Sequence, residues 1–173
     1  MHIGKTARLR EAVTELILEV FRLNGRLLAA GDELVGDIGL TSARWQVLGA
    51  IALSAAPLPV AHIARNMGLA RQSVQRLVDE MTNGGLVRYA VNPHHRRAKL
   101  VLLTDRGEAV YQAAMDRQAP WADSLAAGLT PDAILSATSI IRKIRGRIDR
   151  NVTAASEAAE VLLHRRNNHG GVR

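Results

Sequence analysis

The sequence has no cysteine, only 3% aromatic residues and no long apolar run. Without cysteine, the chain can form no disulfide bond, thiolate metal site or thiol-based redox sensor. No apolar stretch approaches the roughly 20 residues that cross a bilayer, and the basic N-terminus lacks the apolar segment of a signal peptide. We therefore expect a cytoplasmic protein.

The sequence patterns of common enzymes and metal sites are also missing. There is no glycine-rich phosphate loop, no nucleophile elbow and no carboxylate pair in an apolar pocket. The six histidines include no pair at i and i+4 beside an acidic residue, which is the spacing of a helical metal site. We predict no enzyme activity, no metal and no cofactor, and interpret His94 and His95 as solvated.

Composition and charge indicate a globular chain with a polyanionic partner. At 173 residues and 47% hydrophobic content, the chain can bury a substantial core, in one domain or one domain with extensions. Lys and Arg number 23 against 16 acidic residues, which leaves a net charge of +7. That balance favours nucleic acid first and an anionic membrane second.

Residues 69–81 form the stretch around which the rest of the chain is organised. Its apolar residues recur at i, i+3, i+4 and i+7 and so share one helical stripe, namely Val74, Leu77, Val78 and Met81. The other face carries side chains that read base edges, namely Arg71, Gln72, Ser73, Gln75 and Arg76. Because Asp79 lies three residues after Arg76, we predict that the two pair and that Asp79 holds Arg76 toward the groove. The alternative is a polar face that only keeps the helix soluble.

The segments before this stretch predict a helix-turn-helix. A helix over residues 40–51 begins at a Thr41 or Ser42 cap and packs inward. A short helix over residues 60–67 follows, and Gly68 can end it in the left-handed conformation. Two short helices joined by a tight glycine-containing turn, the second presenting Arg, Gln and Ser, match a DNA-binding helix-turn-helix.

The segments after this stretch predict a β-hairpin with a basic tip. Residues 86–91 and 99–103 are rich in β-prone residues, and Pro93 excludes a central strand between them. A hairpin beside a recognition helix is a wing, and its Arg96 and Arg97 are placed to reach a phosphate or a minor groove. A solvated charge run is the alternative reading of these arginines.

The two ends of the chain predict long amphipathic helices. Residues 5–30 carry an apolar stripe of about seven turns, which favours a subunit interface over the core helix of a monomer. Residues 31–39 are predicted to be a loop or a frayed end because they contain three glycines. The members of the stripe are Leu9, Val13, Leu16, Val20, Leu23 and Leu27, widened by Ile17, Phe21 and Leu28.

Two further helices are predicted after the hairpin. One starts at a Thr104 cap and runs to about Ala119, where Pro120 marks a kink or a restart. The next starts at Thr130 and is both amphipathic and strongly basic, which also suits a membrane surface. We disfavour the membrane because the stripe lacks aromatic anchors and is needed to pack against the N-terminal helix. Residues 154–163 prolong this helix or form a short last one, and the tail is predicted to be disordered.

These segments, in this order and spacing, resemble the MarR family of bacterial winged-helix transcription regulators. The resemblance is carried by residues 40–107 and extends through the flanking helices to about 150 residues. Its motifs are Leu40-Thr41, Trp45-Gln46-Val47-Leu48, Ile63-Ala64, Gly68-Leu69-Ala70-Arg71-Gln72-Ser73-Val74, Arg76-Leu77-Val78-Asp79, Gly85-Leu86-Val87 and Arg96-Arg97-Ala98-Lys99-Leu100-Val101-Leu102-Leu103-Thr104-Asp105-Arg106-Gly107.

The resemblance implies a homodimer that binds pseudo-palindromic operator DNA, usually as a repressor, and is often released by a small aromatic or other organic effector. It implies a major-groove role for the five base-reading side chains named above and makes Arg97 the wing-tip arginine. Two residues depart from the family pattern. His95 replaces the Asp that usually orients the wing arginine, and Ala70 replaces a capping residue, which weakens the helix start by about 1 kcal/mol.

We therefore predict a mainly α fold with a small β-hairpin wing, a winged helix-turn-helix flanked by dimerisation helices. Residues 1–39 are assigned to an N-terminal dimerisation helix and loop, 40–104 to DNA binding, 105–163 to C-terminal dimerisation helices and 164–173 to a disordered tail. The predicted partners are double-stranded DNA, a second copy and an organic effector whose pocket Trp45 lines unless Trp45 belongs to the core. The alternative functions are a winged-helix protein-interaction module and an enzyme on a helical scaffold.

Overall fold

The computed structural model describes the backbone of residues 2–95 and 97–169 and the side chains of residues 4–95 and 97–152. It forms two compact units, residues 1–122 and residues 123–173. The elements are α1 (His2–Val35), a 3-10 turn η1 (Gly36–Ile38), α2 (Ser42–Ala52), β1 (Leu58–Pro59), α3 (Val60–Met67), α4 (Arg71–Asn83), β2 (Val87–Ala90), β3 (Leu100–Leu103), α5 (Asp105–Ala126) and α6 (Pro131–His169). The predicted fold class, mainly helical with a small antiparallel sheet, is confirmed.

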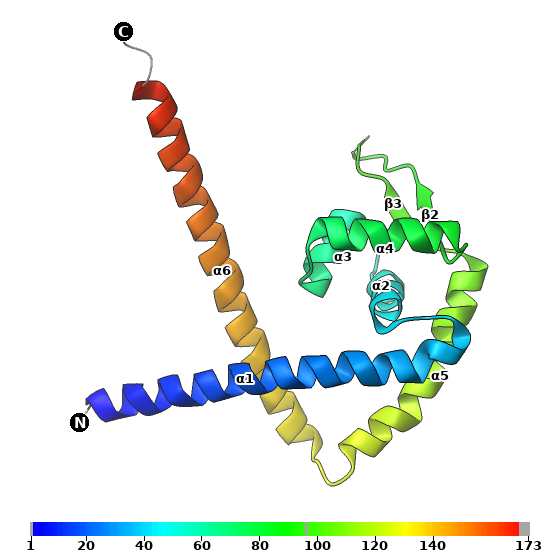
Figure 1. Ribbon diagram of the computed structural model, residues 1–173, viewed down its shortest axis with the longest axis horizontal. Coiled ribbons are helices and arrows are strands. Elements are labelled where there is room, and N and C mark those ends of the chain that lie inside the picture. The colour runs from blue at the N-terminus through cyan, green and yellow to red at the C-terminus, as the bar shows by residue number, and fades with distance from the viewer. Residues whose placement is uncertain (1, 96, 170–173) are drawn as a thin grey trace. The chain divides into compact units, whose positions relative to one another are not determined.

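The core of the first unit lies among α2, α3, α4 and the sheet (Figure 1). The stripe predicted for the recognition helix faces this core: Val74, Val78 and Met81 are buried, and Leu77 is half-buried against them. The other buried apolar residues are Val35, Leu40, Val47, Leu48, Val60, Ile63, Ala64, Leu86, Val87, Val101 and Ala114. Burial of one face of α4 leaves the opposite face exposed, which positions the candidate site.

The helix caps agree with the sequence. The backbone N–H of Arg44 donates to Thr41 Oγ1 at 3.3 Å, and the backbone N–H of Gly107 donates to Thr104 Oγ1 at 3.0 Å. Each bond satisfies one of the N–H groups that a helix start leaves without an intrahelical partner. Gly68 ends α3 at φ +66°, a left-handed conformation that costs other residues more. The turn between α3 and α4 therefore forms as predicted.

The sheet has three strands in the order β1-β3-β2, all antiparallel. The β2-β3 hairpin follows the prediction, with Val87 opposite Leu103 and Ala90 opposite Leu100. The short β1, in which Leu58 pairs with Val101, has no strand-like sequence pattern. It is only two residues long and contains a proline. It is therefore a strand only because it pairs with the free edge of β3.

The first helix is longer than predicted. α1 continues to Val35 and η1 follows, where residues 31–39 were expected to form a loop or a frayed end. Val35 is fully buried, and the Asp32 carboxylate accepts a 2.6 Å hydrogen bond from the backbone N–H of Ser42. A Cβ on Gly31 would come within 2.7 Å of Ser42 Oγ, so glycine permits the close approach of α1 to α2 here. These tertiary contacts outweigh the low helix propensity of the glycines.

The two C-terminal helices also exceed their predicted lengths. α5 continues through Pro120 to Ala126 as one helix, although an internal proline removes one backbone donor and its ring crowds the preceding turn. α6 begins at the predicted Thr130 cap, whose Oγ1 accepts from the N–H of Ala133 at 3.3 Å. It runs to His169, so residues 164–169 are helical and not a disordered tail. Gly146 lies inside α6 without ending it, and residues 170–173 lie outside the described residues.

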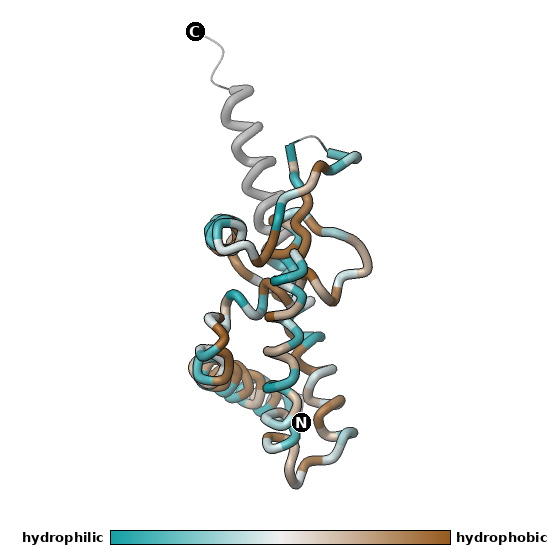
Figure 2. The backbone as a smooth tube through the Cα atoms, turned by 90° about the vertical axis from the view of Figure 1, so that its right-hand side faces the viewer, coloured by the Kyte–Doolittle hydropathy of each residue, from teal (hydrophilic) through white to brown (hydrophobic). Residues whose placement is uncertain are grey.

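Large apolar side chains remain exposed on α1 and α6. Figure 2 views α1 nearly end-on and shows both hydrophobic and hydrophilic positions along it. No single helix in the described part of the chain is long and apolar enough to cross a bilayer. The exposed members on α1 are Leu9, Ile17, Leu18, Phe21, Leu23, Leu27 and Leu28, and those on α6 are Ile134, Leu135, Ile140, Ile141, Ile148 and Val152.

Candidate nucleic-acid interface

The exposed face of α4 carries the predicted base-reading residues. Arg71, Gln72 and Ser73 occupy the first turn and are exposed, and Arg76 is exposed one turn later. Ala70 precedes the helix in an extended conformation and provides no side-chain cap, as the sequence indicated. The first turn of α4 therefore presents donors and acceptors that its own chain does not use.

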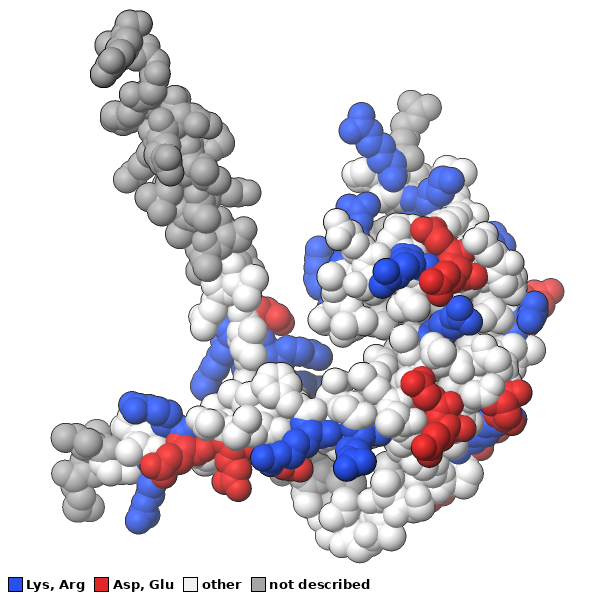
Figure 3. Space-filling model, in the orientation of Figure 1, with Lys and Arg blue, Asp and Glu red and all other residues white. Residues whose placement is uncertain are grey.

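A groove of about 910 Å³ separates α4 from the wing. It contains three cationic side chains, Arg71, Arg97 and Lys99, against a single carboxylate, Asp79. Figure 3 shows Lys and Arg side chains gathered at the wing end of the molecule. Such an excess of cations beside an exposed helix favours a polyanion. The remaining lining residues are Pro59, Val60, Ala61, His62, Gln75, Tyr89, Asn92, His94, His95 and Ala98.

Local hydrogen bonds connect the described residues of the wing tip. Asn92 Oδ1 accepts from the N–H of His94 at 3.0 Å, and the N–H of Ala98 donates to the His95 carbonyl at 3.1 Å. His94 and His95 are exposed, as the sequence indicated, and both line the groove. Arg97 is exposed and also lines it, whereas Arg96 lies outside the described residues. The sequence did not indicate that His62 and Lys99 join this surface.

Gln75 is held by two residues that the sequence analysis did not connect to it. Its amide nitrogen donates to Asp79 Oδ1 at 3.0 Å and to Tyr89 Oη at 2.7 Å. The Tyr89 hydroxyl in turn donates to Asp79 Oδ1 at 2.7 Å. We refer to Gln75, Asp79 and Tyr89 as the polar triad. The polar triad joins α4 to β2. The sequence indicated only that Tyr89 lies on the same face of β2 as the buried Val87, because side chains alternate along a strand.

The predicted pairing of Asp79 with Arg76 is wrong. The Asp79 carboxylate is occupied by Gln75 and Tyr89, and Arg76 makes no hydrogen bond or ion pair with any residue that the structure describes. Residues three apart on a helix can pair, but here the tyrosine from β2 and the glutamine one turn earlier are the partners that tertiary packing brings to Asp79. Arg76 is consequently left with its full donor set for an external partner.

The environment of Tyr89 keeps its hydroxyl protonated. Burial, followed by the hydrogen bond to Asp79 and the charge of that carboxylate, raises the pKa of Tyr89 to about 12. The hydroxyl therefore remains a donor to Asp79 throughout the physiological pH range. Lys99 Nζ lies 5.6 Å from the centre of the Tyr89 ring, a cation–π distance that links the start of β3 to the same cluster.

Two ion pairs join the elements behind this surface. Arg44 Nη2 lies 3.2 Å from Glu80 Oε2 and connects α2 to α4, and Arg117 Nη2 lies 2.7 Å from Asp37 Oδ2 and connects α5 to η1. The hydrogen bond from Arg117 lowers the pKa of Asp37. These exposed pairs position α4 and α5 but contribute little stability, typically below about 1 kcal/mol each.

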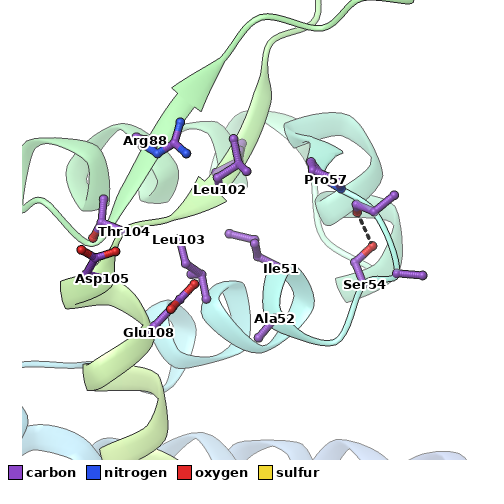
Figure 4. A pocket seen from close by; sticks show the side chains of 13 residues that line it. Ile51, Ala52, Ser54, Pro57, Arg88, Leu102, Leu103, Thr104, Asp105 and Glu108 are labelled. Atoms are coloured by element: carbon purple, nitrogen blue, oxygen red, sulfur yellow. Dashed lines mark hydrogen bonds between the residues drawn. The ribbon is translucent and has the colours of Figure 1, made fainter.

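A second hollow, of about 620 Å³, lies between the end of α2, β3 and the start of α5 (Figure 4). Ile51, Leu102 and Leu103 form its apolar part, and Arg88 and Glu108 supply charges. Trp45 lines neither this hollow nor the groove and packs partly buried against the core. The structure therefore supports the core interpretation of Trp45.

The sequence matches a known family and a curated relative. A family model described as the MarR family matches residues 38–98, which span the helix-turn-helix and most of the wing. An uncharacterized protein of Mycobacterium tuberculosis is 33% identical over 134 residues, which cover 78% of this chain and 92% of the relative. The chain belongs to the MarR family. The prediction of family membership from sequence motifs is confirmed.

Another curated relative and two solved structures extend the comparison. The transcriptional activatory protein BadR of Rhodopseudomonas palustris is 29% identical over 104 residues, 59% of each protein. The crystal structure of CouR from Rhodococcus jostii bound to p-coumaroyl-CoA matches with a TM-score of 0.66 at 25% identity, covering 72% of this chain and 87% of that one. CouR, a transcriptional repressor, bound to a 23-mer DNA duplex matches with a TM-score of 0.64 at 23% identity, covering 73% and 89%.

Proposed function

We propose that this MarR-family chain is a sequence-specific DNA-binding repressor that acts in the cytoplasm as a homodimer, without enzymatic activity. The observation that carries the proposal is the exposed base-reading face of α4 beside a cationic groove. Arg71, Gln72, Ser73 and Arg76 point away from the core, and the hairpin of β2 and β3 places Arg97 at the wing. We assign a phosphate-anchoring role to Arg97 because it lies at the wing. We assign the same role to Arg96 because it is the neighbouring residue in the sequence.

The uncovered apolar faces of α1 and α6 support the homodimer. Leu9 and Phe21 on α1 are 66% and 69% exposed, and Leu135 on α6 is 65% exposed, although leucine and phenylalanine are usually buried. We assign residues 1–39 and 105–163 to dimerisation and 40–104 to DNA binding. Twofold symmetry would place two α4 helices about 34 Å apart, so the operator should be an inverted repeat.

The test is binding to the promoter region upstream of the chain's own gene. A gel shift at two salt concentrations should give a discrete complex that weakens with salt, because Lys and Arg contacts to phosphates release counterions. Transcription from that promoter should fall when the protein is added. A rise would make the protein an activator, as the name of BadR describes that relative, and binding to no promoter DNA would favour a protein-interaction module.

Replacement of Arg76 and replacement of Arg97 should have different effects on the affinities for operator and for random DNA. Arg76→Ala should cost about 1 to 3 kcal/mol on the operator and much less on random DNA, because the unpaired guanidinium of Arg76 is free to make a bidentate base contact. Arg97→Ala should weaken operator and random DNA more evenly and reduce the salt slope by about one ion. Titrations of both DNAs across a salt series measure the two effects.

A matched control for these arginines is Arg65→Ala. Arg65 is exposed at the end of α3 and does not line the groove, so the substitution removes the same charge from the same unit. It should change the affinity for operator and random DNA by less than either groove-side variant. If Arg97→Ala abolished discrimination while Arg76→Ala affected both DNAs equally, helix and wing would have exchanged roles.

We also propose that a small organic effector releases the protein from DNA. The support is the bound p-coumaroyl-CoA named for CouR, which shares the fold of this chain. Addition of salicylate-like and other aromatic compounds, including aromatic acyl-CoA esters, should lower operator affinity and change the fluorescence of the tryptophans. If none of them alters either signal at millimolar concentration, an aromatic effector is excluded.

A further inference from the structure

One of the two polar ends of the Gln75 side chain is already bonded within the protein. Its amide nitrogen is turned onto Asp79 and Tyr89, at 3.0 and 2.7 Å. Its carbonyl oxygen, Oε1, has no partner among the described residues. Gln75 lines the groove together with Arg71, one helical turn earlier, so Oε1 belongs to the surface that we propose reads DNA.

The chemistry of the polar triad determines which end of the amide faces inward. An ionised Asp79 offers only acceptors, so the atom of Gln75 that lies beside it must be the amide nitrogen and not the oxygen. The single hydroxyl hydrogen of Tyr89 is donated to the same carboxylate, so toward Gln75 the hydroxyl oxygen can only accept. Exchanging the two ends of the amide would place Oε1 against two acceptor oxygens.

This orientation limits how Gln75 can read a base. A free glutamine recognises adenine with both ends, because its oxygen accepts from N6 and its nitrogen donates to N7. Gln75 cannot use its nitrogen in this way without leaving Asp79 and Tyr89. In the major groove, adenine and cytosine offer an amino group to an acceptor, whereas guanine and thymine offer only acceptors.

We propose that Gln75 is an acceptor-only base reader that selects an amino group, on adenine N6 or cytosine N4, and that Asp79 and Tyr89 are its positioning residues. This inference rests on the proposed function. Because Tyr89 belongs to β2, the base-reading atom on α4 is positioned by the wing. A side chain ordered before DNA arrives also loses less entropy on binding.

The test is the base preference at one operator position. Operators selected from a randomised library by the wild-type protein and by Gln75→Met identify the half-site position whose preference depends on Gln75. There the wild type should accept A and C on the contacted strand within about threefold of each other and disfavour G and T by about tenfold or more. In the double variant Asp79→Ala, Tyr89→Phe, the freed amide should favour A over C by about tenfold.

Replacement of the contacted adenine by 7-deazaadenine separates the two modes directly, because it removes N7 and keeps N6. Wild-type affinity should change by less than about twofold, whereas the double variant should lose about tenfold. The single variant Tyr89→Phe keeps the aromatic ring and Asp79 but frees one amide hydrogen of Gln75, so its ratio of A to C should lie between those of the wild type and the double variant. Ratios of affinities do not depend on the folded fraction, so loss of stability in a variant does not affect them.

Three outcomes would overturn the inference. A wild-type preference of tenfold for A over C that 7-deazaadenine removes would show that the amide leaves the triad on DNA. A selected operator with no position sensitive to Gln75→Met would show that Gln75 reads no base. If the library yields no selected sequence at all, the proposed function itself fails, and this result is distinguishable from the other two.

Discussion

Leu23→Glu should convert the proposed dimer to monomers at micromolar concentration, raising its dissociation constant by a factor of about 100 or more. Leu23 is 50% exposed in the apolar stripe of α1. In a twofold interface each substitution occurs twice, and burial of one leucine contributes about 1.5 to 3 kcal/mol. Two lost leucines, replaced by carboxylates, therefore remove about 3 to 6 kcal/mol from association. Operator affinity should fall with it, because a monomer contacts one half-site.

Leu18→Glu is the matched control for this substitution. Leu18 lies on the same helix, is 48% exposed and receives the same new charge. It precedes Leu23 by five positions, which turns it about 140° around the helix from Leu23 and past the edge of the stripe that Phe21 marks. Sedimentation velocity of both variants measures the difference. Equal dissociation by the two variants, or a monomeric wild-type protein, would contradict a dimer built on the stripe from Leu9 to Leu28.

Gly107→Ala should destabilise the first unit by about 3 kcal/mol or more, although alanine is the better helix former. Gly107 is buried in the first turn of α5, and a Cβ there would overlap the carbonyl oxygen of Leu86. That carbonyl cannot move freely, because it accepts from the backbone N–H of Thr104 at 3.1 Å and from Thr104 Oγ1 at 3.2 Å. The added methyl group must push α5 away from the start of β2 and break these bonds.

Gly25→Ala provides the opposite expectation on the same chain. Gly25 lies within α1, and a Cβ there would meet nothing within 4 Å, so alanine should stabilise by about 0.5 to 1 kcal/mol through helix propensity. Urea unfolding of both variants at one protein concentration measures the two changes. A higher unfolding midpoint for Gly107→Ala would show that α5 does not approach Leu86 as closely as described.

The wing and the recognition helix act as one surface in this protein. The polar triad ties α4 to β2, and Lys99 stacks on Tyr89 from the start of β3. A change in the position of the wing would therefore disturb the hydrogen bonds that hold the Gln75 side chain.

Local signals in the sequence predicted most of the helix-turn-helix and its exposed face. The spacing of Val74, Val78 and Met81 determined which side of α4 is buried, because apolar residues at helical spacing can only be covered together. Thr104 and Thr130 marked helix starts, and Gly68 marked the turn, because their effects depend on the adjacent backbone alone. Arg71, Gln72, Ser73 and Arg76 were exposed as a consequence.

Only the tertiary structure decided features whose partners lie far apart in the chain. The two residues of β1 become a strand because β3 offers an edge, and α1 continues past Gly31 because Val35 fills the core and Asp32 accepts from Ser42. The partner of Asp79 was mispredicted for the same reason. A helical spacing of three suggested Arg76, but packing of β2 against α4 delivered Tyr89, and hydrogen bonds form with the groups that folding brings within reach.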